Sequence, residues 1–359
     1  MMGLRVGVVG VGPVGDRIIR VLRERNFPVE GDLVVMATHE RTETLAGEQF
    51  LVREVAEELF EGLDVVFFAG REGAKGASVQ WGKVATDAGA WVIDNGSDFR
   101  LEPDYALIVP EVNMDAVSAA NRHICSPNCS TIQMVVAIAP LHRAAGIRRV
   151  VVCTYQSVSG WGQAAMEEFE TQVRQYVEGA QVQFDPAIFA RPIVFDCLPH
   201  IDRFLETGYT REEMKMVHET RKIMGEPNLP ITATAVRVPV LIGHAEAINL
   251  ELERPLSREE ALAILRDPKR APGVVVIDGP SEDPNAVEMR NAPEELQYPT
   301  QADCQREQYK DAVLVGRVRA DETVAHGLSL WCVSDNLRKG AATNVVQIAE
   351  GLIERGLLR

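Results

Sequence analysis

The sequence contains no apolar stretch that approaches the roughly 18 residues needed to cross a bilayer. It is also poor in positive charge: 37 Lys and Arg residues against 52 Asp and Glu residues give a formal charge of −15, and the basic residues are scattered along the chain. Such a chain repels a phosphate backbone, so we expect neither a membrane nor nucleic acid as a partner. An anionic small substrate would need a local cluster of Arg or Lys.

Residues at the start of the chain do not resemble a secretion signal. Met1 to Gly15 combines a short apolar run with a glycine turn, without a basic region, a long apolar region and a small-residue cleavage site. We therefore expect a cytoplasmic protein.

Cysteine is scarce, and no two cysteines form a C-x-x-C pair. This spacing indicates neither a disulfide framework nor a zinc ribbon, and we expect no metal. A buried small hydrophobic residue is the default interpretation of most of the six: Cys125, Cys129, Cys153, Cys197, Cys304 and Cys332.

The length of 359 residues exceeds the size at which a single hydrophobic core stops growing, so we expect two domains. The first hundred residues alternate short apolar runs with amphipathic stretches, which predicts an α/β domain of the Rossmann type with a doubly wound parallel sheet. These segments are Leu4 to Val9, Val14 to Glu24, Leu33 to Thr38, Asp64 to Ala69, Gly73 to Ala88 and Trp91 to Asp94.

From about Arg148 the pattern changes to longer β-branched runs, which predict a second, α+β domain with a mixed sheet. The runs are Val150 to Ser157, Ile231 to Val240, Ala247 to Glu253 and Val313 to Val318. Ser257, followed three residues later by Glu260, predicts a capping box at a helix start. We place one domain at 1–128, completed by a C-terminal helix at 336–359, and a second at 129–335; the motifs and the resemblance described below make the first a dinucleotide-binding domain and the second a catalytic and dimerisation domain.

A glycine turn follows the first apolar run. Gly10, Gly12 and Gly15 have the spacing G-x-G-x-x-G, directly after a predicted strand and before a predicted helix. Glycines there let the backbone approach a pyrophosphate, whose charge is favoured at the helix N-terminus. The turn predicts dinucleotide binding, and a plain strand–helix connection is the alternative.

One cysteine has an unusual neighbourhood. Cys129 follows Pro127 and Asn128 and precedes Ser130, Thr131 and an apolar helical stretch that runs from Ile132 to Leu141. A position near a helix N-terminus favours the thiolate, which is the nucleophilic form of cysteine. Cys129 is therefore the candidate nucleophile.

This segment resembles the nucleophile motif of the aspartate-semialdehyde dehydrogenase family, and similar segments extend from the first residues to the last. The matching segments are Ser126 to Gln133, Thr154 to Gly160, Arg237 to Pro239, Gly243 to Ala247, Asp94 to Arg100, Val109 to Asn113 and Ser334 to Ala342. The resemblance implies reductive dephosphorylation of L-aspartyl 4-phosphate to L-aspartate 4-semialdehyde through a thioester on Cys129. It places this reaction in the biosynthesis of lysine, threonine, methionine and related amino acids.

The resemblance also implies roles for individual residues. His244 is the acid and base, Gln156 orients the substrate, and Asn128 donates to the thioester oxygen. Arg100 and Lys215 hold the phosphate, Arg237 holds the α-carboxylate, and Glu212 meets the α-ammonium group. Glu212 and Lys215 have helical spacing, which predicts one shared face. Without the resemblance, a surface ion pair and a structural histidine would be the plainer interpretations.

NADP is the implied cofactor. A carboxylate after the second strand would favour NAD, whereas Arg and hydroxyl groups would favour the 2′-phosphate of NADP, so Glu40 and Arg41 point in opposite directions. The cofactor-binding residues implied by the turn and the resemblance are Gly10, Gly12, Pro13, Val14, Gly15, Thr38, Arg41, Gly70, Ser159, Gly160 and Asn336.

The alternatives are an N-acetylglutamyl-phosphate reductase, which shares the fold and the thioester chemistry, and a non-catalytic dinucleotide-binding paralogue. The partners we expect are small-molecule substrates and a second copy of the chain. The resemblance implies a homodimer built on the sheet of the second domain, and a homotetramer stays open.

Overall fold

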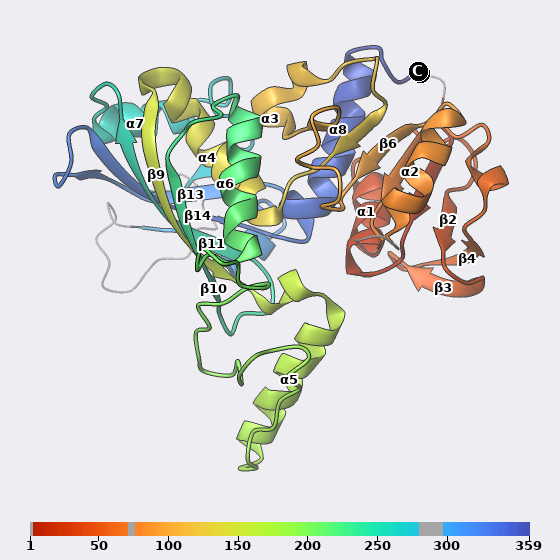
Figure 1. The fold of residues 1–359 in the computed structure, drawn as a ribbon, viewed down its shortest axis with the longest axis horizontal. Coiled ribbons are helices and arrows are strands. Elements are labelled where there is room, and N and C mark those ends of the chain that lie inside the picture. Colours follow the sequence, from red (N-terminus) through yellow and green to blue (C-terminus); the bar gives the residue numbers. More distant parts are fainter. Residues whose placement is uncertain (1–2, 71–75, 280–296) are drawn as a thin grey trace. The chain divides into compact units, whose positions relative to one another are not determined.

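The computed structural model describes residues 3–70, 76–279 and 297–359. The chain divides into two units, Met1–Asn128 with Gly340–Arg359 and Cys129–Lys339 (Figure 1). Among the described residues, no helix combines the length and the apolar character that a bilayer span requires.

The first unit contains an eight-stranded sheet in the order β3-β4-β2-β1-β5-β6-β8-β7. Its pairings are parallel except for β3 with β4. The strands β1, β5 and β6 are buried along their whole length, as expected where helices cover both faces of a parallel sheet. The strands are β1 (Val6–Val9), β2 (Val34–Ala37), β3 (Arg41–Leu45), β4 (Glu48–Glu54), β5 (Val65–Phe68), β6 (Trp91–Asp94), β7 (Ala106–Leu107) and β8 (His123–Cys125).

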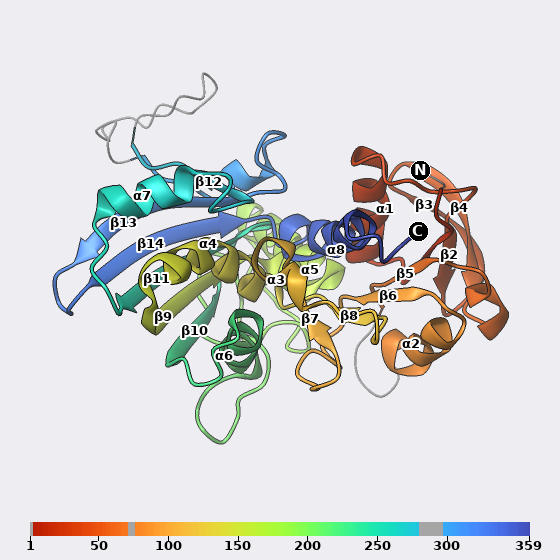
Figure 2. The same ribbon diagram turned by 90° about the horizontal axis from the view of Figure 1, so that it is seen from above.

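Helices lie on both faces of this sheet (Figure 2). One face carries α1 (Pro13–Glu24) and α8 (Thr343–Glu354), which share an apolar core with the sheet. The other face carries η1 (Glu57–Phe60) and α2 (Ala77–Asp87). The short helices α3 (Pro110–Asn113) and η2 (Met114–Ala116) precede β8. The predicted Rossmann-type fold is present; residues 73–75 of the predicted second helix lie outside the described residues.

The β3–β4 hairpin was not predicted from the sequence. Ala46 and Gly47 connect its strands with φ angles of 51° and 88°, as a tight hairpin turn requires. Arg41, expected in a loop after β2, is the first residue of β3.

The second unit contains a six-stranded mixed sheet in the order β10-β9-β11-β14-β13-β12. The β10–β9 and β12–β13 pairs are parallel, and the pairs between them are antiparallel. The strands are β9 (Ile147–Gln156), β10 (Ile231–Arg237), β11 (His244–Leu252), β12 (Val274–Val276), β13 (Val313–Asp321) and β14 (Gly327–Ser334). The predicted mixed sheet is therefore confirmed, with β12 and β14 as additional strands.

Three helices form a layer against the second sheet: α4 (Cys129–Ala145) lies next to both α6 (Arg211–Met224) and α7 (Arg258–Arg266). The helix α4 is almost completely buried, which explains why apolar residues occupy all its sides. The predicted capping box of Ser257 and Glu260 starts α7, and a second box formed by Thr210 and Glu213 starts α6.

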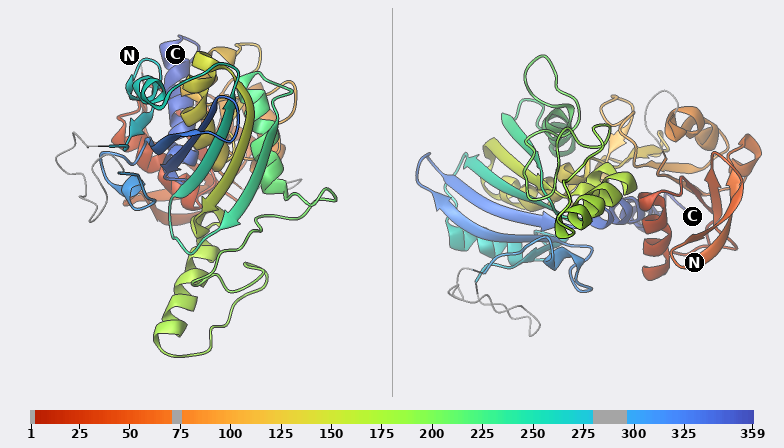
Figure 3. Two further views of the ribbon diagram at one scale, coloured as in Figure 1. Left: turned by 90° about the vertical axis from the view of Figure 1, so that its left-hand side faces the viewer. Right: turned by 90° about the horizontal axis from the view of Figure 1, so that it is seen from below.

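An arm extends from one end of the second sheet and carries η3 (Val158–Trp161) and α5 (Gln163–Val177), drawn in yellow-green in Figure 3. Several large apolar side chains on this arm are exposed: Trp161, Tyr176, Val177, Phe184, Phe195 and Phe204. Two short elements complete the fold. The 3-10 helix η5 (Asp303–Gln305) precedes β13, and the π-helical turn η6 (Arg338–Ala342) follows β14 and continues into α8.

Candidate active site

Three predicted site residues meet at one end of the second sheet. Gln156 and Arg237 are the last residues of the parallel strands β9 and β10, and they are direct partners in the register. His244 is the first residue of β11, which runs antiparallel to β9, and it therefore starts at the end where β9 finishes. All three are buried. The topology thus brings together an amide, a guanidinium and an imidazole.

Cys129 is the first residue of α4, as predicted, and it is half-buried. Backbone N–H groups in the first turn of a helix have no partner within the helix, and their partial positive charge favours a thiolate. The sulfur lies close enough to Arg237 for its charge to raise the pKa of the guanidinium. Asn128 is buried immediately before the helix.

Arg237 is 4% exposed, and its Nη1 donates to the carbonyl oxygen of Ser157 at 2.6 Å. Burial lowers its pKa from the ordinary value, while the charges of Glu212 and Cys129 act in the opposite direction. A buried guanidinium beside a carboxylate and a sulfur provides an oriented site for a small zwitterion or carboxylate.

His244 is completely buried, and its Nδ1 accepts a hydrogen bond from the backbone N–H of Ser157 at 3.1 Å. A backbone amide can only donate, so we assign the proton of the neutral ring to Nε2. Burial and then the charge of Arg237 lower the pKa of His244 from 6.5 to about 3. Nε2 has no hydrogen-bond partner among the described residues. His244 therefore presents one N–H group for a ligand.

Asn336 anchors the backbone around His244. Its Oδ1 accepts from the Oγ atoms of Ser157 and Ser159, both at 3.1 Å, and from the backbone N–H of Gly243 at 2.9 Å. The Oγ of Ser157 also lies 3.1 Å from Nδ1 of His244. The side chain of Asn336 thus links the segments before β11 and after β9.

Gly160 lies against the same two reactive side chains. A Cβ at this position would be 2.9 Å from Nη1 of Arg237 and 3.1 Å from Nε2 of His244. These distances are shorter than ordinary van der Waals contact, so a side chain at this position would push against both groups.

Glu212 and Lys215 share one face of α6, as their spacing predicts. Nζ of Lys215 lies 3.2 Å from Oε2 of Glu212 and 3.3 Å from Oδ2 of Asp202. Nε2 of Gln156 donates to Oε1 of Glu212 at 3.3 Å. Glu212 is 6% exposed, so this is not the solvated surface pair that composition alone suggested.

The glycine turn in the first unit has the geometry of a dinucleotide loop. Gly10 has φ +104°, and a Cβ on it would lie 2.7 Å from the backbone of Ala69 and of Gly70; a Cβ on Gly15 would lie 1.9 Å from the carbonyl oxygen of Gly10. Gly12, in contrast, faces open space and precedes Pro13, the first residue of α1. This open helix N-terminus fits a pyrophosphate.

Arg41 and Thr38 are exposed near the end of β2. Nε of Arg41 donates to Oε2 of Glu43 at 2.8 Å, and Nη1 donates to the carbonyl of His39 at 3.2 Å. The guanidinium is therefore held by a carboxylate two residues away, and Glu40 is exposed beside it.

Comparisons with known proteins give both units a family. Residues 5–120 match the model of the semialdehyde dehydrogenase NAD binding domain, and residues 138–339 match that of the semialdehyde dehydrogenase dimerisation domain. The aspartate-semialdehyde dehydrogenase of Aquifex aeolicus is 44% identical over 99% of this chain and 100% of its own. That of Bacillus subtilis is 40% identical over 99% of each chain.

A solved structure agrees with these matches. The crystal structure of aspartate semialdehyde dehydrogenase II from Vibrio cholerae, complexed with ASA, has a TM-score of 0.86 and 40% identity and covers 99% of both chains. The chain belongs to the aspartate-semialdehyde dehydrogenase family. The expected family, fold class and class of enzyme, an oxidoreductase with a nicotinamide-dinucleotide domain, are thereby confirmed.

Sequence reasoning missed several residues that support the site of this family member. Ser157 lies inside the matching segment Thr154 to Gly160, and its backbone N–H holds His244, a role that only the pairing of β9 with β11 reveals. Asn336 was expected on the cofactor side, and its hydrogen bonds show that it also supports His244 through Ser157 and Gly243. Glu246 was not noticed, although an acidic residue in an apolar strand is a visible signal.

Glu246 is completely buried, and its Oε2 accepts from Sγ of Cys332 at 3.5 Å. Its Oε1 has no hydrogen-bond partner among the described residues. Burial raises the pKa of Glu246 well above its ordinary value. The pKa of this carboxyl group is higher in the folded protein than in the unfolded chain, where it has its ordinary value of 4.5. Its protonation therefore favours the folded state at low pH, and this contribution to stability is lost as the pH rises from 4.5 through the pKa of the folded protein.

We therefore expect Glu246→Gln to stabilise the protein at pH 8 and to have little effect at pH 4, because the unfolded carboxyl is then also protonated. A rise in Tm of at least about 3 °C at pH 8 is the predicted size. Glu206→Gln, at an exposed position, is the control. Calorimetric scans at both pH values test this; an equal effect of Glu246→Gln at the two values would contradict it.

Proposed function

We propose that the chain catalyses the NADPH-dependent reductive dephosphorylation of L-aspartyl 4-phosphate to L-aspartate 4-semialdehyde. The observation that carries this proposal is the buried guanidinium of Arg237, flanked by the carboxylate of Glu212 and the sulfur of Cys129. An α-amino acid offers a carboxylate and an ammonium group to such a pair, and places its side-chain carbonyl toward the thiol.

In this proposal Cys129 attacks the acyl carbon, and the bond to phosphate breaks to leave a thioester. Arg237 binds the α-carboxylate through two parallel hydrogen bonds, and Glu212 binds the α-ammonium. Gln156, tied to Glu212, orients the substrate beside the sulfur. Arg100 and Lys215 bind the phosphate, and Asn128 donates to the thioester oxygen.

His244 acts as a hydrogen-bond donor through its Nε2–H group. The role as acid and base implied by the resemblance includes taking the proton of the thiol at Nε2. A neutral ring can do so only if its own proton is on Nδ1. Nδ1, however, faces the backbone N–H of Ser157, which would then meet another N–H group. A donated N–H instead stabilises negative charge on the carbonyl oxygen of the reacting carbon. The helix N-terminus and Arg237 favour the thiolate without help from the imidazole.

The first unit holds the dinucleotide at Gly10, Gly12, Pro13, Val14 and Gly15, with Gly70 at the neighbouring strand end. When bound, the reduced nicotinamide would supply the hydride that reduces the thioester, and breaking of the bond between the acyl carbon and the sulfur then releases the semialdehyde and returns Cys129 as a thiolate. We also assign Ser159, Gly160 and Asn336 to cofactor binding. Thr38 and Arg41 support a preference for NADP, with Glu43 as an internal competitor for Arg41.

We assign catalysis and dimerisation to residues 129–335 and dinucleotide binding to 1–128 and 336–359, a division that differs from the two units of the structure at residues 336–339, which belong to the second unit. A homodimer is supported by the match to a dimerisation domain and by the exposed apolar side chains of the arm that carries α5. The proposal is compatible with either a homodimer or a homotetramer, and it includes a cytoplasmic location.

The proposed reaction is tested in reverse, by phosphate-dependent reduction of NADP with L-aspartate 4-semialdehyde, repeated with NAD. No turnover with a pure sample would reject the function. Turnover of N-acetylglutamate semialdehyde in its place would favour the alternative, an N-acetylglutamyl-phosphate reductase. Equal specificity constants with NAD would reject the cofactor preference and point to Glu40.

The two anion sites are separable in this assay. We expect Arg100→Gln and Lys215→Gln to raise the KM for phosphate about ten- to a hundredfold, since charge-assisted hydrogen bonds contribute about 1.5–3 kcal/mol each. Arg237→Lys should raise the KM for semialdehyde instead, because an ammonium cannot reproduce the paired hydrogen bonds of a guanidinium. Initial rates with each substrate varied decide this, and equal effects on both substrates would contradict the roles.

A further inference from the structure

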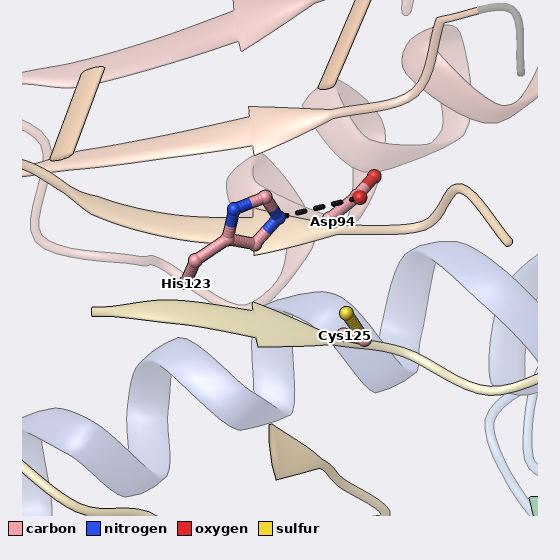
Figure 4. Close-up of side chains that lie close together, drawn as sticks. All are labelled: Asp94, His123 and Cys125. Atoms are coloured by element: carbon pink, nitrogen blue, oxygen red, sulfur yellow. Dashed lines mark hydrogen bonds and ion pairs between the residues drawn. The ribbon is translucent and has the colours of Figure 1, made fainter. Parts of the chain in front are cut away.

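A buried histidine–carboxylate pair lies in the first unit (Figure 4). Asp94 ends β6, and His123 begins the neighbouring parallel strand β8. Nε2 of His123 lies 3.3 Å from Oδ2 of Asp94, and the two residues are 4% and 1% exposed. A carboxylate that is buried in this way needs hydrogen-bond partners close by, because an unpaired buried charge is strongly unfavourable.

The imidazole of His123 is held in one orientation. The rings of Phe99 and Tyr105 contact it edge-on, with centroids at 5.0 and 4.9 Å. A Cβ on Gly82 would lie 2.8 Å from Cε1 of the imidazole, so the glycine leaves the room that the ring occupies. The packing therefore directs Nε2 toward Asp94.

The other carboxylate oxygen of Asp94 is connected to Arg100 by hydrogen bonds through the loop that follows β6. Oδ1 accepts from the backbone N–H of Gly96 at 2.7 Å. The carbonyl of Gly96 then accepts from Nε of Arg100 at 3.0 Å, and the carbonyl of Asn95 accepts from Nη2 at 2.8 Å. A continuous series of hydrogen bonds thus runs from the imidazole, through the loop after β6, to the guanidinium.

We propose that His123 is a positioning residue for Arg100, acting through Asp94 and the backbone of Gly96. This inference rests on the proposed function, in which Arg100 binds the phosphate. The imidazole holds the carboxylate of Asp94, and the carboxylate holds the loop whose carbonyls orient the guanidinium. Loss of the His123 hydrogen bond frees the loop, and the guanidinium then loses its preset direction toward the phosphate.

The same cluster contains Cys125, and ligand atoms of Asp94, His123 and Cys125 lie within 4.8 Å of one another. Both oxygens of Asp94 already accept hydrogen bonds, from Gly96 and His123, so the carboxylate has donors without a metal. Bound Zn²⁺ would be the alternative use of the three side chains.

The test compares His123→Phe with His123→Gln. Phenylalanine keeps the aromatic packing against Phe99 and Tyr105 but has no N–H group, whereas Nε2 of glutamine can donate to Asp94. The matched control is Val35→Ala, which opens a cavity in β2 of the same unit and destabilises it without touching the loop. Each full-length variant is assayed for the KM of phosphate and of semialdehyde, for the Kd of inorganic phosphate by calorimetry, and for its metal content.

We expect His123→Phe to raise both the KM and the Kd of phosphate about five- to tenfold with little change in the KM of semialdehyde, and His123→Gln to restore most of the loss. Unchanged phosphate constants in His123→Phe, an equal shift in Val35→Ala, or one Zn²⁺ per chain in the wild type would overturn the inference. If His123→Phe weakens phosphate binding as expected but the wild type turns over no semialdehyde, the proposed function alone would be overturned.

Discussion

Replacing Cys129 with alanine should lower kcat by at least about 10⁴-fold while leaving the affinity for NADP within about a factor of two. The covalent step has no substitute, because Cys304, the thiol that lies beside Gly243 next to His244, has a pKa raised by burial and is not a thiolate near neutral pH. Stopped-flow assays and fluorescence titration with NADP measure the two quantities. Substantial turnover in a pure sample of the variant would reject the thioester mechanism.

Thiol labelling gives an independent control for this variant. Burial raises the pKa of the Cys153, Cys304 and Cys332 thiols, so these residues remain unreactive thiols near neutral pH. Cys197 is exposed and provides the matched control, since Cys197→Ser should keep full activity. Iodoacetamide should then modify one fast thiol in Cys197→Ser, with protection by semialdehyde, and none in the double variant with Cys129→Ala.

The second large effect is expected for His244→Asn, with kcat lower by about 10²–10⁴-fold and both KM values changed little. The pKa of His244 is lowered to about 3, so the ring is neutral at every pH above about 4. The ratio of wild-type to variant kcat should therefore stay constant from pH 5.5 to pH 8.5, a range set by that value and by the ordinary value of 6.5.

Measured pH–rate profiles of both proteins check this prediction. A wild-type advantage that falls as the pH drops below 6.5 would show that the imidazole titrates near its ordinary value. Such a result would restore the role of His244 as the base that takes the proton of the thiol. A large rise in KM with little change in kcat would make it a binding residue.

The fold of the first unit was predictable because buried parallel strands leave a simple pattern of apolar runs, as in β1 and β5. The β3–β4 hairpin was not, since Arg41 to Glu54 is mostly polar and exposed, and its pairing with β2 is a long-range event. In the same way α4 was predictable from its start at Cys129, whereas the exposed arm with α5 gave no comparable pattern.

The site divides along similar lines. Residues whose side chains take part directly in the proposed reaction, such as the thiol of Cys129 and the guanidinium of Arg237, could be predicted from the family resemblance. Ser157 and Asn336 did not, because a hydroxyl and an amide have no distinctive chemistry until the fold shows which backbone they hold. Which ring nitrogen of His244 carries the proton likewise depends on the backbone N–H of Ser157, and the position of that N–H group cannot be read from the type of any residue.

The absence of a side chain at Gly160 affects the room available for the substrate as well as the packing of the protein. Nη1 of Arg237 and Nε2 of His244 share the small volume that a methyl group at Gly160 would enter. In the proposed reaction the acyl carbon changes from planar to tetrahedral beside these two side chains, and a single hydrogen atom at Gly160 leaves room for that change. The enzyme's tolerance for a bulkier acyl group is therefore set partly by a residue that contributes no functional group.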